Sequence, residues 1–446
     1  KKMGLALSII AICTACGSSG GDKAAAGDPS GKQDVKPAAQ QPKEPVELII
    51  YTMAADTDEY FNLRFGDAVR KKFPNYTIKY MTDTVGNNDE KLTRLVTNGT
   101  SVDLIFATNG WFEKQLFQYG FAYDMTDLIK TTKLDMTQFN PSYSEMFSKG
   151  FGGRMYYLPV QADIPTIYYN KALFDKFAIP YPKDGMSWDD MYATSKKLNR
   201  NEGGVAYSGY IPSMTYTFAG NPMSIPYLKP GTTTPTINTD ERWKTFFQKY
   251  LADAAASADP GYFKGKNDIT EFFAGRSAMA TLVTANMTSS RAQLEPMNFD
   301  VTTFPTLKES PKTGPQALSV NMAVSKTSKH KEEAMEVLKY IVSDEVQSGL
   351  AKIGIVPVVK NVDIQKLLGT GSVFKDKNWS SVFFNQWANN TYYGAMLIDL
   401  RAIYIKYGNE VLFGTSDINT ALRKAEEEAL KKVEEVKGLI VVSNVY

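Results

Sequence analysis

The sequence predicts an α/β fold in which mainly parallel β-strands form a sheet with helices on both faces. Short runs rich in β-branched and aromatic residues alternate with amphipathic helical runs, an order typical of βαβ units. The chain has 446 residues, of which 43% are hydrophobic and 22% are charged. This composition is ordinary for globular proteins, and the length allows two or three domains.

The alternation is clearest in the first part of the globular body. Strands are expected at 46–51, 76–80 and 102–106, and helices at 58–73 and 89–97. Ligands of such sheets bind beyond the carboxyl ends of the strands. The loops 52–58 and 107–111 are therefore the first places to expect a site.

The C-terminal part is predicted to be mainly helical. Apolar residues at helical spacing give 332–341 a core-facing stripe. Ser343 is suited to cap the next helix, and Ser416-Asp417 precedes a long amphipathic helix with a mixed charged face.

The N-terminus has the pattern of a secretory signal. Lys1-Lys2 precede an apolar run that is too short to span a bilayer, followed by small residues. Thr14-Ala15-Cys16 resembles a bacterial lipobox, although Cys13 stands where Leu is usual. We interpret residues 1–16 as a lipoprotein signal peptide and lipobox, with Cys16 as the lipidated residue. A Cys-x-x-Cys metal or redox pair is the alternative, but no other ligand lies nearby.

Residues 17–45 are rich in Gly, Ser, Ala, Asp, Lys, Gln and Pro. Such a segment buries too little apolar area to offset the entropy of ordering it, so we expect a flexible tether. An anchor followed by a tether would hold the folded body outside the cytoplasm.

Several classes of function are disfavoured. The sequence has no P-loop, dinucleotide fingerprint or Gly-x-Ser-x-Gly elbow. His330 is the single histidine, and Cys13 and Cys16 are the only cysteines, which argues against His-dependent catalysis, most zinc sites and a disulfide framework. A net charge of +2 gives no field that favours nucleic acid. We expect no cofactor and no metal, while a carboxylate pair among the 48 acidic residues stays open. The oxygen-rich segments 56–58 and 87–90 are interpreted as turns and helix caps rather than calcium sites.

Several segments, in the same order along the chain as in the family, resemble the family 1 extracellular solute-binding proteins of ATP-binding-cassette importers, which are similar to maltose-binding protein. Together they cover almost everything after the tether. The most specific of these segments extends from Met155 to Asp163 and continues to Tyr169-Asn170-Lys171-Ala172-Leu173-Phe174. The others are the segments 103–106, 120–129, 187–190, 272–279 and 354–357.

This resemblance implies a periplasmic-binding-protein-like fold of type II, with two α/β lobes around a cleft and a hinge of several segments. Lobe 1 is expected to comprise residues 46–160 and 322–370, and lobe 2 residues 163–318 and 377–446. The chain would pass between lobes near 160–163, 318–322 and 369–377. A solute that contacts both lobes binds the closed form more tightly and so closes the cleft.

The candidate ligand-binding residues combine carboxylates and amides with aromatic faces, the groups that suit sugars. Asp163 stands where sugar binders of the family place an acidic ligand, whereas 285–287 lacks the Gly-x-Trp of many relatives. Each aromatic side chain could instead pack in the core, as we expect for Trp188. The full set is Asp56, Asp58, Asn109, Trp111, Gln161, Asp163, Tyr210, Tyr216, Asn286, Trp387 and Tyr392.

The resemblance predicts a non-enzymatic, membrane-anchored solute-binding component of an importer. It would capture a sugar, with an oligosaccharide expected, and deliver it to the permease subunits. It would be a monomer, lipid-anchored to the outer face of a bacterial cell membrane, with no nucleic-acid partner. Two alternatives stay open: another solute such as a peptide or polar metabolite, and an anchored glycan-degrading enzyme.

Overall fold

The computed structural model describes residues 46–52, 56–83, 85–108, 111–266, 268–391 and 396–435. Residues 44–446 form one unit. The predicted signal peptide, Cys16 and the tether lie outside the described residues.

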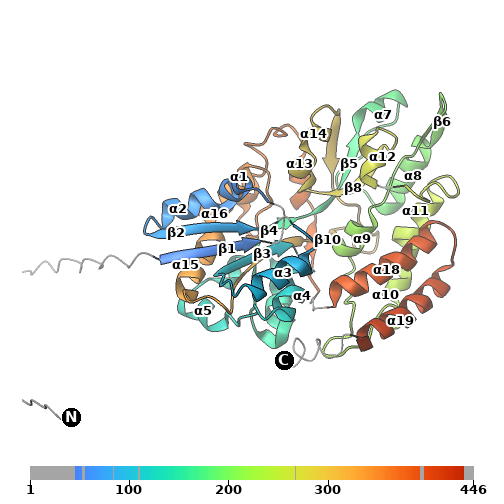
Figure 1. Cartoon of the computed structure of the whole chain (residues 1–446). Coiled ribbons are helices and arrows are strands. Elements are labelled where there is room, and N and C mark those ends of the chain that lie inside the picture. The colour runs from blue at the N-terminus through green and yellow to red at the C-terminus, as the bar shows by residue number, and fades with distance from the viewer. Residues whose placement is uncertain are drawn as a thin grey trace, which may run out of the picture. The chain divides into compact units, whose positions relative to one another are not determined.

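A five-stranded sheet in the order β2-β1-β3-β11-β4 forms the first part of this unit. β1 (Val46–Thr52) lies parallel to β2 (Tyr76–Thr82) and to β3 (Leu104–Thr108). α2 (Asp67–Lys72) lies on one face, and α3 (Asn88–Thr97) and α4 (Trp111–Gln118) lie on the other (Figure 1). Connections between parallel strands are right-handed. The chain goes from β1 to β2 on one side and then back across β1 to β3 on the other, so the helices of these two connections lie on opposite faces of the sheet. The predicted parallel strands are confirmed here.

The helix expected at 58–73 is built from three pieces. α1 (Asp58–Phe61) begins at Thr57, whose hydroxyl accepts from the backbone N–H of Tyr60 at 3.1 Å. A π-helical turn, η1 (Asn62–Gly66), follows and leads directly into α2. A π turn inserts one extra residue and shifts the side chains after it around the helix. Arg64, in this turn, is buried.

The expectation of a mainly parallel arrangement is wrong for several other strands, although β10 (Thr313–Gln316) and β12 (Gln386–Ala388) do pair in parallel. β11 (Leu318–Val324) lies antiparallel to both β3 and β4 (Leu158–Asp163). A second sheet, in the order β8-β5-β9, is antiparallel throughout, with β8 at Met279–Val283, β5 at Pro165–Asn170 and β9 at Phe299–Thr302. Local periodicity predicts a strand but not the direction of its neighbour, which depends on where the chain returns.

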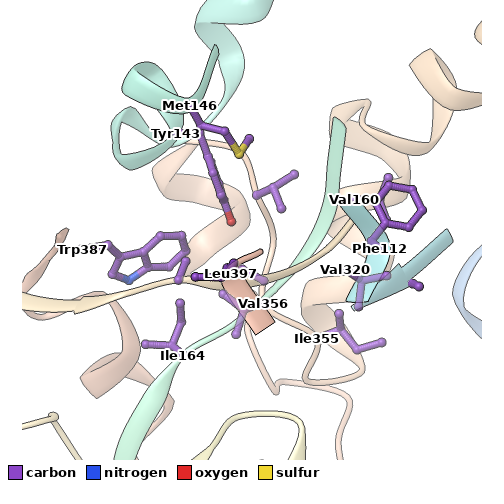
Figure 2. Close-up of a cluster of buried hydrophobic side chains, with 14 of the residues drawn as sticks. Phe112, Tyr143, Met146, Val160, Ile164, Val320, Ile355, Val356, Trp387 and Leu397 are labelled. Atoms are coloured by element: carbon purple, nitrogen blue, oxygen red, sulfur yellow. The ribbon is translucent and has the colours of Figure 1, made fainter. Parts of the chain in front are cut away.

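Three connections join the two sheets within the described residues: Ile164, residues 303–317 between β9 and β11, and residues 369–379. Ile164 alone separates β4 of the first sheet from β5 of the second, and its N–H donates to Thr284 Oγ1 at 3.1 Å. Buried hydrophobic side chains of distant segments gather at this join, where Val160 and Ile164 share a cluster with Val356 and Trp387 (Figure 2).

A third connection runs through residues 369–379. Gly369 donates its N–H to Ala351 O at 2.8 Å, and the ring of Phe374 packs against Phe299 of β9 at 5.4 Å. Trp379 bonds Phe374 O through its indole N–H at 2.9 Å. The segment therefore links the first-sheet region to the second.

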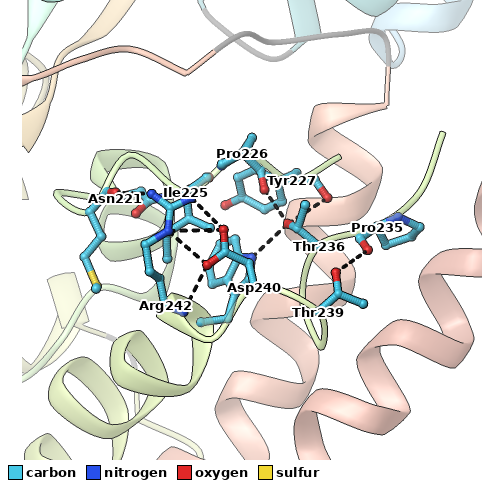
Figure 3. Close-up of polar contacts among 11 residues, drawn as sticks. Asn221, Ile225, Pro226, Tyr227, Pro235, Thr236, Thr239, Asp240 and Arg242 are labelled. Carbon is cyan, nitrogen blue, oxygen red and sulfur yellow. Dashed lines mark hydrogen bonds and ion pairs between the residues drawn. The ribbon is translucent and has the colours of Figure 1, made fainter. Parts of the chain in front are cut away.

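The second sheet is covered by helices with an aromatic core. α8 (Trp188–Leu198), α9 (Met214–Gly220), α10 (Arg242–Phe247), α18 (Leu397–Leu412) and α19 (Ile418–Glu435) are its main elements. Trp188 is 2% exposed, which confirms its packing role. At the start of α10, Arg242 pairs with Asp240 (Figure 3). Trp243 of the same helix donates to Thr236 Oγ1 at 3.0 Å, which fixes the preceding loop.

The remaining elements are shorter or connect those above. Their helices are α5 (Thr126–Thr131), α6 (Ser144–Lys149), α7 (Lys171–Lys176), α11 (Asp253–Ala256), α12 (Asp268–Phe273), α13 (Asn286–Ser289), α14 (Arg291–Leu294), α15 (Lys331–Ile341), α16 (Asp344–Lys352) and α17 (Val362–Gln365). The short turns are η2 (Met136–Gln138), η3 (Pro141–Tyr143), η4 (Gly150–Gly153), η5 (Gln248–Ala252) and η6 (Trp379–Phe383). The remaining strands are β6 (Arg200–Glu202), β7 (Val205–Tyr207), β10 (Thr313–Gln316) and β12 (Gln386–Ala388). None of the helices in the described ranges combines the length and the apolar character needed to cross a bilayer.

The third connection gives a testable prediction. Gly369 has φ +75°, and an added Cβ would lie 2.1 Å from Trp379 Nε1, whereas Gly231 has φ +72° with open space around it. Gly231→Ala should cost about 1–2 kcal/mol, the strain of the left-handed region alone. Gly369→Ala should cost roughly 1–3 kcal/mol more because the Trp379 ring must move. Equal losses in urea unfolding would contradict this packing.

Candidate functional site

A cavity of about 480 Å³ opens where β1, β3 and β4 end, facing α13. Asp56, Tyr60 and Arg64 line it from the segment after β1, and Gln161 and Asp163 line it from β4. Thr52, Thr57, Phe106, Ala107, Ala285, Thr288, Ser289 and Val320 complete the lining. The cavity is thus bounded by elements of the first sheet and by the helix that follows β8 of the second.

Arg64 is the central charged group of the cavity. Its side chain is 3% exposed and forms an ion pair with Asp56. Its Nη1 donates to Gln161 Oε1 at 3.3 Å, and its guanidinium carbon lies 4.1 Å from the centroid of the Tyr60 ring. Its Nε has no hydrogen-bond partner among the described residues. The guanidinium is therefore held in place on several sides and keeps one donor unused.

Asp163 is a carboxyl group with altered acidity. Burial raises its pKa to about 7, while the positive charge of Arg64 and a hydrogen bond with Thr284 oppose that rise. Between about pH 4 and the folded pKa, the folded state keeps a proton that the unfolded chain has lost. This group therefore makes folding stability fall as the pH rises through that window. At neutral pH the carboxyl can both donate and accept a hydrogen bond.

Tyr60 and Tyr216 surround this carboxyl group. Burial raises the pKa of Tyr60, with Arg64 lowering it and Asp163 raising it. Burial also raises the pKa of Tyr216 to about 12, and the negative charges of Asp268 and Asp163 add to the rise. Asn286 hydrogen-bonds Tyr216 and accepts from the Val283 N–H at 3.0 Å. Both phenols stay protonated at neutral pH, and Tyr60, which lines the cavity, can donate to a polar ligand.

The structure brings some of the predicted residues together at the cavity. Asp56, Gln161 and Asp163 line it. The charge of Asp163 acts on Tyr216, and Asn286 hydrogen-bonds Tyr216, but neither Tyr216 nor Asn286 lines the cavity. Asn109 and Tyr392 lie outside the described residues. Trp111 begins α4, but its side chain lies outside the described part of the chain.

Three other predicted residues lie elsewhere. Asp58 is exposed in the first turn of α1, where an acidic side chain suits the helix N-terminus. Tyr210 is 1% exposed and shares a hydrogen bond of 2.8 Å with Thr281, so it packs in the core. Trp387 is 5% exposed, donates its indole N–H to Val382 O, and lines a different cavity. The sequence indicates polar and aromatic side chains but not the direction in which each points.

Arg64 and Tyr60 line the cavity and contact one another, but they are not among the residues predicted from the sequence. A signal for Arg64 was present. It lies three residues after Phe61 and one before Phe65, so a charged residue interrupts the apolar side of an amphipathic helix. A cation at such a place needs a buried partner, which points to a site.

The family described as bacterial extracellular solute-binding protein matches residues 22–348. The chain belongs to this family. The cavity is lined by carboxyl, guanidinium, amide, hydroxyl and aromatic groups, a mixture that suits reversible capture of a polar solute.

Solved structures of solute-binding proteins share the fold. An ABC substrate-binding protein from Listeria monocytogenes, in complex with cycloalternan, matches with a TM-score of 0.69 at 19% identity, covering 88% of this chain and 100% of that one. A cyclic α-maltosyl-1,6-maltose binding protein from Arthrobacter globiformis matches with a TM-score of 0.68 at 20% identity, covering 87% and 99%. The sugar-binding protein MalE from Xanthomonas citri matches with a TM-score of 0.68 at 15% identity, covering 88% and 99%. The type II architecture with two α/β lobes is thus confirmed.

The electrostatic coupling in the cavity can be tested without a ligand. Arg64→Leu removes the charge that lowers the pKa of Asp163, so that pKa should rise above about 7. Carboxyl ¹³C resonances followed against pH measure the change. Arg70→Leu is the matched control, because Arg70 lies on the same helical segment and bonds Asn62 Oδ1 at 2.6 Å instead. An unchanged Asp163 titration in the Arg64 variant would show that the two groups are not coupled.

Proposed function

We propose that this solute-binding protein captures an oligosaccharide in the cavity around Arg64 and Asp163 and delivers it to the permease of an ABC importer. The observation that carries the proposal is the lining itself. A carboxyl group of raised pKa, a buried guanidinium with an unused N–H, an amide and hydroxyls surround one cavity. Sugar hydroxyls both donate and accept hydrogen bonds, so they satisfy this mixture.

Recognition would use polar and aromatic contacts together. Asp163 and Gln161 would accept hydrogen bonds from hydroxyl groups, and Arg64 Nε would donate one. The ring of Tyr60 would meet the apolar face of a sugar ring. Because Arg64 is already held by Asp56 and Gln161, little entropy is lost when it binds a solute.

Closure would follow from a solute that contacts both sides of the cavity. Thr288 and Ser289 of α13 face the Arg64 side across the cavity. A solute bonded to both sides favours the closed form over the open one. We assign residues 46–160 and 322–370 to lobe 1 and residues 163–318 and 377–446 to lobe 2, with the connections between the sheets as the hinge.

The similar structures support a saccharide as the solute. One was solved with cycloalternan and another is described as binding cyclic α-maltosyl-1,6-maltose. A further structure was solved with mannotriose, with a TM-score of 0.64 at 16% identity, covering 86% of this chain and 100% of that one. Identity is low in every case, so the support concerns the class of solute and not a particular sugar.

The cellular setting is part of the proposal. Lipidation of Cys16 and the tether 17–45 would hold a monomeric body at the outer face of the bacterial cell membrane, close to the permease subunits. The protein would release its solute unchanged and so would not act as an enzyme. The family places the protein outside the cytoplasm, and the anchor rests on the lipobox resemblance.

A calorimetric and thermal-shift screen tests the function. We expect saturable binding of one oligosaccharide class and a stabilisation of about 2.7 kcal/mol when the ligand is present at 100 times its dissociation constant. Chromatography of the incubated glycans should show no product. Binding of peptides alone would redirect the proposal to another solute, and a product would redirect it to an enzyme.

Asp163 should make binding pH-dependent. If its carboxylate accepts sugar hydroxyls, the bound state lowers the pKa from about 7, so binding near neutral pH releases a proton. Affinity should fall by up to about tenfold per pH unit below the pKa. Calorimetry in two buffers of different ionisation enthalpy measures the release, and Asp163→Asn should abolish it. Proton uptake, or release that persists in the variant, would exclude this role.

A further inference from the structure

We propose that a second cavity, lined by Trp387 and Asn385, is a separate binding site for a small neutral polyhydroxylated molecule of up to disaccharide size. The cavity measures about 440 Å³, which lies within the range of small-ligand sites. Its lining shares no described residue with the cavity around Arg64.

The lining has the chemistry that neutral sugars and polyols require. Asparagine, glutamine, serine and threonine side chains surround two aromatic rings, and none of the described lining residues is charged. The rings of Phe383 and Trp387 are stacked, with centroids 5.6 Å apart and planes 25° apart. The indole N–H of Trp387 is used by Val382 O, so the indole contributes its apolar surface.

Two buried polar groups in this lining lack hydrogen-bond partners within the described chain. Ser142 Oγ is on a residue that is 2% exposed, and Asn385 Nδ2 is on a residue that is 7% exposed. A buried donor or acceptor without a partner costs about 1–3 kcal/mol, so such groups at a cavity wall are suited to a polar guest. A ligand hydroxyl can satisfy either group, because it can both donate and accept a hydrogen bond.

The walls of the cavity are fixed by backbone bonds, and they come from distant parts of the chain. Asn140 donates its N–H to Val358 O at 2.8 Å, and Asn390 donates to Ser142 O at 2.8 Å. On the other wall, Gln386 of β12 donates to Lys312 O at 2.9 Å, and Ser224 Oγ donates to Asn389 O at 2.8 Å. These hydrogen bonds, including the one from Asn390 to Ser142 O, hold the walls of the cavity in place.

Because no described residue of the lining is charged, the site should prefer neutral ligands over anions, a selectivity that the cavity around Arg64 does not share. Transfer of an anion into a lining without a cation is costly. Lactose and lactobionate are suitable probes because they are similar in size and differ in charge. The proposal stands whether or not the cavity around Arg64 binds sugars.

The test uses the full chain labelled with 5-fluorotryptophan. The chain carries Asp163→Ala, which is expected to lower the affinity of the cavity around Arg64 for sugars. The protein has 5 tryptophans, and Trp387→Phe assigns the fluorine resonance of Trp387. We expect lactose to shift that resonance saturably in the millimolar range and lactobionate to leave it unchanged. Asn385→Leu should weaken the lactose effect at least about tenfold, the loss expected when a hydrogen bond is removed and a cavity filled.

Controls separate binding from folding. Asn419→Leu replaces an exposed asparagine on α19 and should leave the lactose titration unchanged. Ser142→Ala removes a single oxygen and should also weaken binding, which keeps the test decisive if Asn385→Leu unfolds. A linear shift, an equal response to lactobionate, or an unchanged titration in both lining variants would overturn the proposal, even if the cavity around Arg64 binds an oligosaccharide.

Discussion

The buried cation Arg64 is the constraint on which the candidate solute site depends. Asp56, Gln161 and the Tyr60 ring contact a guanidinium whose side chain is only 3% exposed, while its Nε has no partner within the described chain. These contacts fix the segment after β1 against the end of β4. They also hold the charge that opposes the effect of burial on Asp163. The polarity of the cavity, its acidity and its shape thus follow from one interaction network.

The interaction network around Arg64 lies at the connection between the two sheets. Asp163 ends β4, Ile164 follows, and Pro165 begins β5 of the other sheet. A carboxyl group at that point lies where the chain passes from one sheet to the other. In the closure proposed above, a solute that contacts Asp163 would do so at the junction between the two sheets. The antiparallel strand β11 runs beside β4 through the same region.

Much of the fold was predictable because periodicity is local. The run 46–51 became β1, the run 76–80 became β2, and the capping pattern at Asn87 became a complete capping box with Glu90. Strand direction was not predictable, since β11 returns from a distant part of the chain. The candidate site was only partly predictable. Asp163 and Gln161 follow from their position at the end of a strand. Arg64 interrupts an apolar helical face, which indicates burial, but no propensity indicates the π turn in which it lies. Tyr210 and Trp387 had suitable chemistry, but packing directed them away from the cavity.

Closure of the cavity around the solute is the central claim, and a distance measurement tests it most directly. Spin labels at Lys71→Cys on α2 and Ala292→Cys on α14 occupy exposed positions on the two sides of the cavity. Cys13→Ser and Cys16→Ser remove the native thiols. Pulsed dipolar spectroscopy with and without a saturating oligosaccharide should give a shorter and narrower distance distribution when the ligand is bound. The same distribution in both samples, with binding shown by calorimetry, would contradict the account.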